Sequence, residues 1–331
     1  MQSGIAVHSR TLVVTIALGL ALLAPGVCSA AGASCDRACL LATADGYLGK
    51  LAGHTASSLR TDRGFVFTEN NTPLPLGDAL WKTINKVGAA PIHVIDTKTG
   101  QVGLFVEIDE SDRPALLAAR LALRNGQLNE LDTVVARQES ASFLKPEGFA
   151  NEAALMEAPL AAAERRPRAE LIAIATTYFR NLVDSDAALP EFDETCNRVE
   201  NGVQSTNNPV PAGSPSGSTL NAPFSSLGCL EQFKTRSLTF VSGIRGLSYP
   251  LIDEDTGVVF ASLIFDHNGL VRRGSPAGQL SVKLPSPYSF LVRELFKIRN
   301  GRIVHIDAVI TSVPYGTQPV WQHERMGAHL P

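Results

Sequence analysis

The feature that most constrains the fold of this chain is an internal repeat, in which four short motifs occur twice in the same order. The pairs, first copy with second, are Tyr47 with Tyr178, Glu69-Asn70 with Glu200-Asn201, Asp96–Gly100 with Asp253–Gly257, and Arg124–Gly126 with Arg299–Gly301. The spacing between the copies grows from 131 to 157 and then to 175 residues, so the second copy carries insertions of 26 and 18 residues. A repeat of this length predicts that the folding unit is about half of the chain and is used twice.

The N-terminal segment has the pattern of a secretory signal. Arg10 precedes the apolar run Leu12–Leu23, and small residues around Ala30 and Ala31 suit cleavage. The run is short for a bilayer span, although a retained anchor is the alternative. We therefore expect residues 1–31 to be a signal peptide, and the mature chain to be secreted or periplasmic and free of the membrane after cleavage.

Composition narrows the classes of partner and cofactor. With 44% hydrophobic and 18% charged residues and a net charge of −3, the chain suits a globular protein that binds neither nucleic acid nor an anionic membrane. It has no glycine-rich phosphate loop, no Gly-x-Ser-x-Gly motif and no His-Glu-x-x-His motif. We therefore expect no nucleotide or other cofactor and no metal, and a serine hydrolase of that class is disfavoured.

Four cysteines follow the expected cleavage site, and an even number in an exported chain favours disulfides. Cys196 and Cys229 flank the insertion Gly202–Gly228, and a bridge between them would stabilise the fold by roughly 3–4 kcal/mol through loop entropy. Cys35 and Cys39 could pair only with distortion if both were helical, so pairing with the second copy is the alternative. A four-cysteine zinc site is a further alternative, disfavoured because the chain lacks the usual Cys-x-x-Cys spacing.

Each copy has the pattern of a helix followed by at least four strands. Apolar residues at helical spacing predict helices over Leu40–Leu51 and Leu171–Leu182, each followed by a loop that leads to the Glu-Asn pair. Alternating strand patterns and Asn-Gly turns then predict strands at 91–95, 101–108, 117–123 and 127–136, and at 247–252, 258–265, 288–298 and 302–311. Strands grouped after helices predict an α+β fold with largely antiparallel sheets.

These patterns set the expected domain boundaries. They are a first repeat at 32–137, a connector at 138–164, a second repeat at 165–315 with a Pro/Ser-rich insertion at 202–228, and a C-terminal tail at 316–331.

The motifs at 68–70, 76–81, 196–202 and 253–257 resemble the NTF2-like superfamily, which includes ketosteroid isomerase and SnoaL-type cyclases. More specifically, the chain is similar to an uncharacterised family of secreted fungal and bacterial proteins. The resemblance implies two cone-shaped units, each a curved antiparallel sheet wrapped around helices. Because many proteins of this fold dimerise through the sheet, it also implies a monomer whose tandem copies form an internal pseudo-dimer. Function transfers poorly, since the fold hosts isomerases, lyases, cyclases and binding modules.

Comparison of the copies suggests candidate substrate-binding residues. Glu200-Asn201 could supply a carboxylate base and a substrate-binding amide, but its presence in both copies favours a turn that the fold requires. Arg198 replaces Phe67 of the first copy, so this position does not need arginine for the fold. Arg198 could clamp a substrate carboxylate, or simply form an ion pair with Glu200 or Asp193. Arg198, Glu200 and Asn201 are therefore the candidate binding residues.

The candidate catalytic residues are His305, Asp307, His267 and Tyr178. His305 and Asp307 lie two apart on the last strand and share a face, as a base and its orienting group would, unless this face is a polar solvent edge. His267 follows a strand at the mouth of a loop. Tyr178, on the helix, could donate a hydrogen bond to an oxyanion inside a cone, or could simply pack.

These patterns favour an exported lyase or isomerase that needs no cofactor and transfers a proton in a pocket of the second repeat. Its substrate would be a small organic molecule, such as a phenolic or a sugar derivative. The alternative is a non-catalytic periplasmic module that binds small molecules or acts as a scaffold. A cavity with converging Tyr, Arg and His side chains would favour the enzyme, whereas a filled interior would favour the module.

Overall fold

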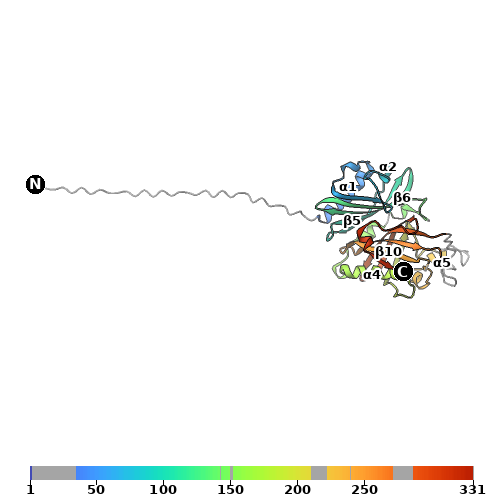
Figure 1. The fold of residues 1–331 in the computed structure, drawn as a ribbon. Helices are drawn as coiled ribbons and strands as arrows, with labels where there is room; N and C mark the ends of the chain where they lie inside the picture. Colours follow the sequence, from blue (N-terminus) through green and yellow to red (C-terminus); the bar gives the residue numbers. More distant parts are fainter. Residues whose placement is uncertain are drawn as a thin grey trace. The chain divides into compact units, whose positions relative to one another are not determined.

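The computed structural model describes residue 1 and residues 35–141, 143–149, 152–209, 222–238, 240–270 and 286–330. The expected signal peptide and part of the insertion at 202–228 lie outside these residues. Within the described ranges, no helix is long and apolar enough to cross a membrane. Residues Ser34–Pro331 form one compact unit with an α+β fold built on two curved sheets (Figure 1).

The first repeat consists of α1 (Arg37–Ala52) and a seven-stranded sheet. Its elements after α1 are η1 (Ala56–Ser58), β1 (Thr61–Glu69), β2 (Thr72–Pro73), α2 (Leu80–Thr83), β3 (Ile84–Val87), β4 (Ile92–Asp96), β5 (Gln101–Glu110), β6 (Arg113–Arg124) and β7 (Gln127–Ala136). The strand order is β2-β1-β7-β6-β5-β3, and β4 also pairs with β5. Every pair is antiparallel except β1 with β7, which is parallel.

A connector of short turns joins this sheet to the second repeat. It contains η2 (Pro146–Phe149), α3 (Ala153–Glu157) and η3 (Ala162–Glu164), and α4 (Arg168–Val183) then begins the second repeat. The second sheet contains β8 (Phe192–Glu200), β9 (Val203–Gln204), β10 (Gly243–Asp253), β11 (Val258–His267), β12 (Tyr288–Arg299), β13 (Arg302–Val313) and β14 (Ala328–Leu330). The short helices α5 (Ala222–Ser225), α6 (Cys229–Lys234) and α7 (Gln322–Arg325) complete the described part.

The second sheet has the order β14-β10-β11-β12-β13-β8-β9, and β8 pairs with β13 in parallel, as β1 does with β7. The predicted α+β class and the strands around the Asn-Gly turns are therefore confirmed. Two details differ from expectation. The segments expected as loops before each Glu-Asn pair contain β1 and β8, so each sheet is mixed. Residues 316–331, expected as a tail, contribute α7 and β14, which pairs with β10.

Each long helix covers one face of its own sheet. The helix α1 buries Leu40, Tyr47 and Leu51 in the core of the first repeat, and α4 buries the equivalent apolar residues in that of the second. Figure 1 shows α1 beside β5 and α4 beside β10, in agreement with their contacts. These helix-facing cores are where the resemblance places a cone interior.

The opposite faces of the two sheets share a third core. It combines Phe105 of β5 with Phe260 of β11 and Val309 of β13, and Phe149 of the connector packs among them. The rings of Phe105 and Phe260 meet edge to face with their centroids 5.8 Å apart. Side chains on these faces are thus enclosed between the repeats instead of meeting solvent.

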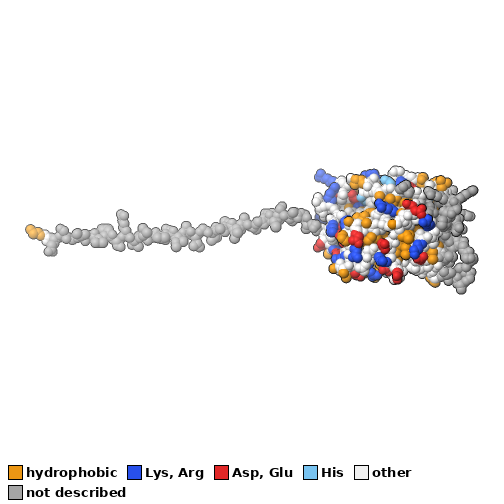
Figure 2. Space-filling model, turned by 90° about the horizontal axis from the view of Figure 1, so that it is seen from below, with side chains coloured by type: hydrophobic (Ala, Val, Ile, Leu, Met, Phe, Trp, Pro, Cys, Tyr) orange, Lys and Arg blue, Asp and Glu red, His pale blue; other side chains and the backbone are white. Residues whose placement is uncertain are grey.

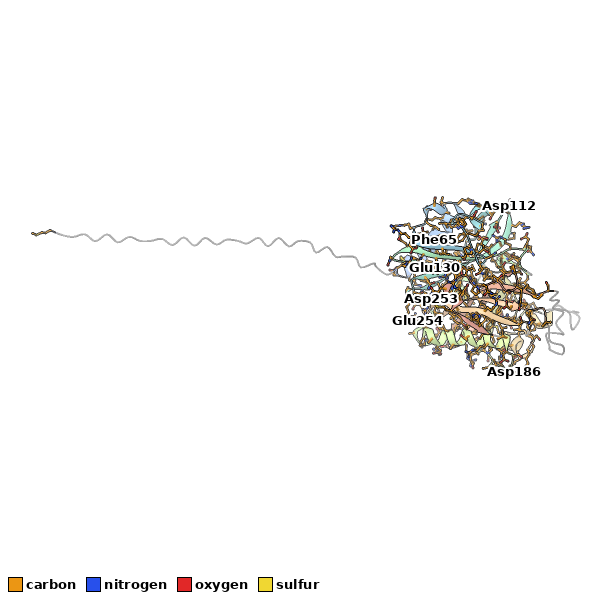
Figure 3. The ribbon with its side chains drawn as sticks, in the orientation of Figure 1. Phe65, Asp112, Glu130, Asp186, Asp253 and Glu254 are labelled. Carbon is orange, nitrogen blue, oxygen red and sulfur yellow. A yellow bond between two sulfur atoms is a disulfide. The ribbon has the colours of Figure 1, made fainter. Side chains whose placement is uncertain are left out.

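The two Asp-x-x-x-Gly turns bind the repeats to each other reciprocally. The carboxylate of each turn accepts a backbone N–H from the other repeat and pairs with the first arginine of the other repeat's helix. The contacts are Asp96 with Arg168 (2.5 Å) and the Ile252 N–H (2.9 Å), and Asp253 (labelled in Figure 3) with Arg37 (2.7 Å) and the Ile95 N–H (3.3 Å). Because equivalent residues make both sets of contacts, the duplication reappears as an internal pseudo-symmetry.

Charge on the exposed face drawn in Figure 2 is mixed, with basic and acidic side chains interspersed. This face carries no continuous basic stripe, in keeping with the small net charge of −3.

Candidate functional site

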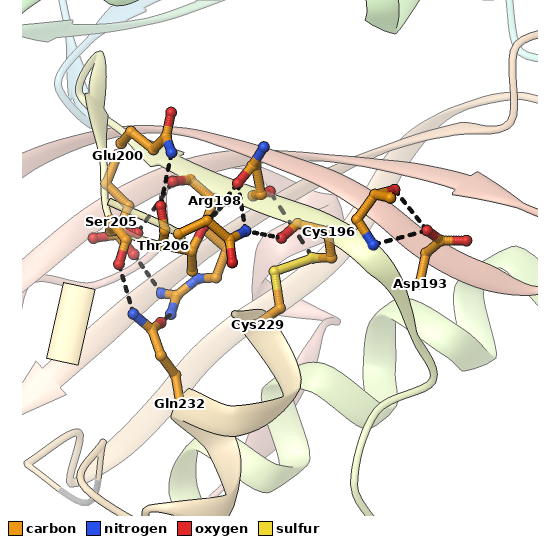
Figure 4. Close-up of a disulfide and its surroundings, with 12 residues drawn as sticks. Asp193, Cys196, Arg198, Glu200, Ser205, Thr206, Cys229 and Gln232 are labelled. Carbon is orange, nitrogen blue, oxygen red and sulfur yellow. Dashed lines mark hydrogen bonds and ion pairs between the residues drawn. A yellow bond between two sulfur atoms is a disulfide. The ribbon is translucent and has the colours of Figure 1, made fainter. Parts of the chain in front are cut away.

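The helix-facing core of the second repeat contains a buried charged cluster around Arg198. This β8 side chain is 5% exposed, and its guanidinium carbon lies 5.8 Å from the centroid of the Tyr178 ring. Its Nη1 donates to Gln232 Oε1 of α6 at 2.8 Å, and its Nη2 pairs with the Glu200 carboxylate (Figure 4). The structure therefore brings Tyr178, Arg198 and Glu200 together, as the sequence suggested.

Glu294 of β12 completes this cluster. The carboxyl is 2% exposed and lies close enough to the Tyr178 hydroxyl for each group to shift the pKa of the other. In register, Glu294 is flanked by Ala261 on β11 and Ala308 on β13, and Glu200 follows beyond Ala308. Burial raises the pKa of Glu294 to about 8, with Arg198 opposing this shift and Glu200 adding to it. Glu294 therefore titrates near neutral pH.

Tyr178 is held as a neutral hydrogen-bond donor. Burial raises the pKa of its hydroxyl well above the usual value, although Arg198 acts in the opposite direction. Its ring contacts four aromatic side chains, namely Phe179, Phe192, Phe233 and Phe296. This packing fixes the ring and fills the space around it, so the interior near Tyr178 is dense.

The charged cluster belongs to the second repeat alone. Arg198 and Glu294 occupy the positions of Phe67 and Ala119 in the first repeat, at the offsets of 131 and 175 residues. Tyr47, the counterpart of Tyr178, packs edge to face on Trp81 at 5.7 Å. The first repeat thus keeps the tyrosine and Glu69, the counterpart of Glu200, but lacks the arginine and the second carboxyl, so the fold can form without Arg198 and Glu294.

Sequence reasoning missed Glu294, although a signal for it exists. On β12 the helix-facing positions alternate as Phe290, Val292, Glu294 and Phe296, so one acid interrupts an apolar face. An acidic residue in such a pattern is a candidate functional group when the equivalent residue of the other copy is an alanine.

A disulfide fixes the insertion over this cluster. Cys196 and Cys229 are bonded, with Cα atoms 5.8 Å apart, so α6 is tied to β8. The Phe233 ring centroid then lies 6.0 Å from the guanidinium carbon of Arg198. Gln232 of the same helix lies beside Arg198 (Figure 4). The favoured pairing of these cysteines is therefore present.

Cys35 and Cys39 are bonded to each other, with Cα atoms 5.3 Å apart. Cys35 precedes α1 and only Cys39 is helical, so the case of two helical cysteines does not apply. With all four cysteines of the described chain in these two bridges, pairing across the copies and a four-cysteine zinc site are both wrong.

His305 and Asp307 lie on the opposite face of the sheet from Tyr178. The expected contact between them is present, with His305 Nε2 and Asp307 Oδ1 3.0 Å apart. They share the face of Val309, which belongs to the core between the repeats, whereas Ile306 belongs to the helix-facing core. This pair is neither a solvent edge nor part of the cluster around Arg198.

His267 is also not part of the charged cluster around Arg198. Its ring stacks between Phe240 and Tyr288, with centroids 5.8 and 4.7 Å away. Burial lowers the pKa of His267 to about 4, and Asp266 opposes this only in part. At neutral pH the imidazole is therefore uncharged and packed among aromatic rings.

The Asn201 side chain is hydrogen-bonded to the backbone of β13. Its Nδ2 donates to the Ile310 carbonyl at 2.9 Å, and its Oδ1 accepts the Ile310 N–H at 2.8 Å. Asn70 makes the same two bonds with Val135 in the first repeat. Both asparagines have positive φ, near 48°, which favours this residue type. The geometry supports the turn interpretation, in which the Asn201 amide is already occupied.

Two cavities, of about 220 and 270 Å³, lie on the first repeat. The smaller is lined by charged side chains including Glu110, Arg113 and Arg137, and the larger by residues around Lys86 and Phe149. Neither is lined by Glu294 or by any of the seven residues that the sequence suggested.

One family model and several solved structures match parts of this chain. Residues 164–310 match a family model described as a domain of unknown function (DUF8021). Two of the similar solved structures are each 14% identical to this chain. A de novo designed protein with a curved β-sheet covers 31% of this chain and 89% of its own, with a TM-score of 0.25. AusH from Aspergillus nidulans covers 49% and 97%, with a TM-score of 0.27. No curated protein is significantly similar to the chain. The family match spans the repeat that carries the charged cluster.

Proposed function

We propose that the second repeat is the proton-transfer site of an exported lyase or isomerase that needs no cofactor. The observation that carries this proposal is Glu294, a buried carboxyl with a pKa of about 8 beside the Tyr178 hydroxyl and the Arg198 guanidinium. A carboxyl that titrates near the working pH can both accept and return a proton. Strongly shifted pKa values of this kind concentrate at functional sites.

In this mechanism Glu294 removes a proton from a carbon beside a carbonyl, and Tyr178 and Arg198 donate hydrogen bonds to the oxygen on which charge develops. Returning the proton to a second carbon completes an isomerisation without any change in atoms or electrons. In the lyase reaction the same enolate breaks the bond between its β-carbon and an oxygen leaving group, and Glu294 returns the proton to that oxygen. The substrate is a small carbonyl compound, such as a phenolic or a sugar derivative.

Access to Glu294 depends on the insertion. Because Phe233 and Gln232 cover the cluster and the Cys196–Cys229 bond ties the start of α6 to β8, the substrate reaches Glu294 only when the side chains of Phe233 and Gln232 turn aside. Both repeats are NTF2-like units in this proposal, and the second is the one whose interior has gained charge. His305, Asp307 and His267 take no direct part, and Asn201 is a structural turn residue.

Deuterium exchange into a panel of candidate compounds tests the proposal while the natural substrate is still unidentified. The purified chain is incubated in D₂O with phenolic ketones and keto-sugars, and deuterium at carbon is measured by mass spectrometry. Glu294→Gln should lower the exchange rate by about 10²–10⁴-fold, because it removes the group that carries the proton. Tyr178→Phe should also slow exchange.

The duplication supplies a matched control, since Tyr47→Phe removes the equivalent hydroxyl from a repeat that lacks the counterparts of Arg198 and Glu294. This variant should exchange at the wild-type rate. Equal loss in Tyr47→Phe and Tyr178→Phe, or full activity in Glu294→Gln, would contradict the assignment of the site.

A non-catalytic binding or scaffolding module is the second candidate, and the dense packing around Tyr178 favours it. In that case the cluster only braces α6 against β8. The wild-type chain would then exchange no compound of the panel, and the variants would differ from it in stability alone.

We also propose that the mature chain is secreted or periplasmic and works as a pseudo-dimeric monomer with a small molecule as its partner. Two disulfides suit an oxidising compartment. The shared core and the reciprocal Asp96 and Asp253 contacts satisfy one face of each sheet within the chain. Size-exclusion chromatography with light scattering should therefore give the mass of one chain, and a stable dimer mass would contradict this.

A further inference from the structure

Glu152, His305 and Asp307 bring three metal-ligand atoms together, away from the proposed proton-transfer site. His305 Nε2 lies 3.0 Å from Asp307 Oδ1 and 3.1 Å from Glu152 Oε2, and the three ligand atoms lie within 4.8 Å of one another. His305 and Asp307 come from β13, whereas Glu152 belongs to the connector just before α3. The group thus joins two separate segments of the chain.

The hydrogen bonds of the protein do not satisfy every polar atom of Glu152, His305 and Asp307. A single Nε2–H of His305 faces carboxylate oxygens of both Glu152 and Asp307. Asp307 is fully buried, its Oδ2 has no hydrogen-bond partner, and its neighbours across the sheet are the apolar Leu295 and Val199. An unpaired buried carboxylate oxygen is costly. One buried acceptor of the site therefore lacks a partner, which a cation would supply.

The charge balance of these three residues also favours a bound cation. Two carboxylates face one imidazole, which supplies at most one positive charge. The nearest cation in register is Lys297, opposite His305, but its Nζ donates to the carbonyls of Met156 and Ala158 at 3.1 and 2.7 Å. A divalent ion would balance both carboxylates and leave the imidazole neutral, which is the form that binds metals.

We propose that Glu152, His305 and Asp307 bind one divalent transition-metal ion, for which Zn²⁺ is the best-suited probe. Imidazole nitrogen and carboxylate oxygen both bind Zn²⁺ at about 2.0–2.2 Å in a tetrahedron. Such bonds place ligand atoms roughly 3.4 Å apart, close to the spacing found here. Water would take the fourth position. The ion fastens the connector to β13, so it stabilises the junction between the repeats.

Titration of the purified chain with Zn²⁺, after removal of metal with a chelator, tests the site. We expect one equivalent to bind, with a rise in Tm, and Co²⁺ to give the visible absorption of a four-coordinate site. Glu152→Gln should weaken Zn²⁺ binding by at least about 100-fold, because it removes a direct ligand. Glu152 is partly exposed, whereas Asp307 is fully buried, so this variant keeps the test valid even where Asp307→Asn does not fold.

His93 gives a matched control, because it also lies between two carboxylates. Its Nδ1 is 2.9 Å from Glu157 and its Nε2 is 3.3 Å from Asp45, so the two carboxylates meet opposite edges of the ring and share no ligand position. His93→Gln should bind Zn²⁺ as the wild-type chain does. Absence of binding by the wild type, unchanged binding by Glu152→Gln, or loss of binding in His93→Gln would each overturn the proposal. None of these outcomes depends on the proton-transfer activity.

Discussion

Arg293→Ala should lower the free energy of unfolding by about 3–5 kcal/mol, because it leaves two buried carboxylates without their shared cation. Arg293 is 1% exposed and pairs with Asp132 of the first repeat at 2.7 Å and with Glu324 of α7 at 2.9 Å. The pKa of Asp132 shows the strength of this contact. Burial favours its protonated form, yet the arginine holds the pKa below the usual value.

Urea denaturation measures the loss, and Arg236→Ala is the control. Arg236 pairs with Asp186 at 2.8 Å, but both side chains are largely exposed, so its removal should cost less than about 1 kcal/mol. Equal losses in the two variants would show that Arg293 contributes no more than a surface pair. Replacing Arg293, Asp132 and Glu324 together by apolar residues of similar size should recover much of the stability, because the desolvation cost disappears with the charges.

Arg293 also illustrates what sequence patterns cannot reveal. Its two partners lie in the other repeat and near the C-terminus, so no local spacing connects them. By contrast, the turns that organise each repeat are local. Asn125 and Asn300 have φ of 52° and 53° and are followed by glycines, as an Asn-Gly hairpin turn requires. The hairpins could therefore be predicted, and the strands β1 and β8 could not. Both are rich in polar residues, and parallel pairing with β7 and β13 decides their conformation.

The candidate site also has features that the sequence could predict and features that it could not. Comparison of the copies identified Arg198 because Phe67 shows that the fold tolerates an apolar side chain there. The hydrogen bond between His305 and Asp307 was also expected from strand alternation. Their surroundings were not, because the face that they share is covered by the other repeat and by Glu152 of the connector. Local pattern places side chains on a face, whereas long-range packing decides what that face meets.

Between pH 4.5 and 8, Glu294→Gln should gain stability relative to the wild-type chain as the pH rises. The pKa of Glu294 rises from an ordinary value of 4.5 to about 8 on folding, chiefly because of burial. In this window the folded chain keeps a proton that the unfolded chain has lost, so a rise in pH favours unfolding. The expected contribution is a loss of up to about 1.4 kcal/mol per pH unit. Glutamine cannot ionise and keeps the neutral state at every pH.

Free energies of unfolding measured by urea denaturation at several pH values test this prediction. The other ionisable groups contribute equally to both chains, so the difference between wild type and Glu294→Gln isolates Glu294. The exposed Glu147 provides the control, because Glu147→Gln removes a carboxyl without changing the buried cluster. The wild type should lose stability relative to Glu294→Gln up to about pH 8, and its curve should stay parallel to that of Glu147→Gln. Parallel curves for Glu294→Gln would mean that Glu294 is ionised throughout the window. The proposed proton-transfer role would then lose its physical basis, whatever the substrate.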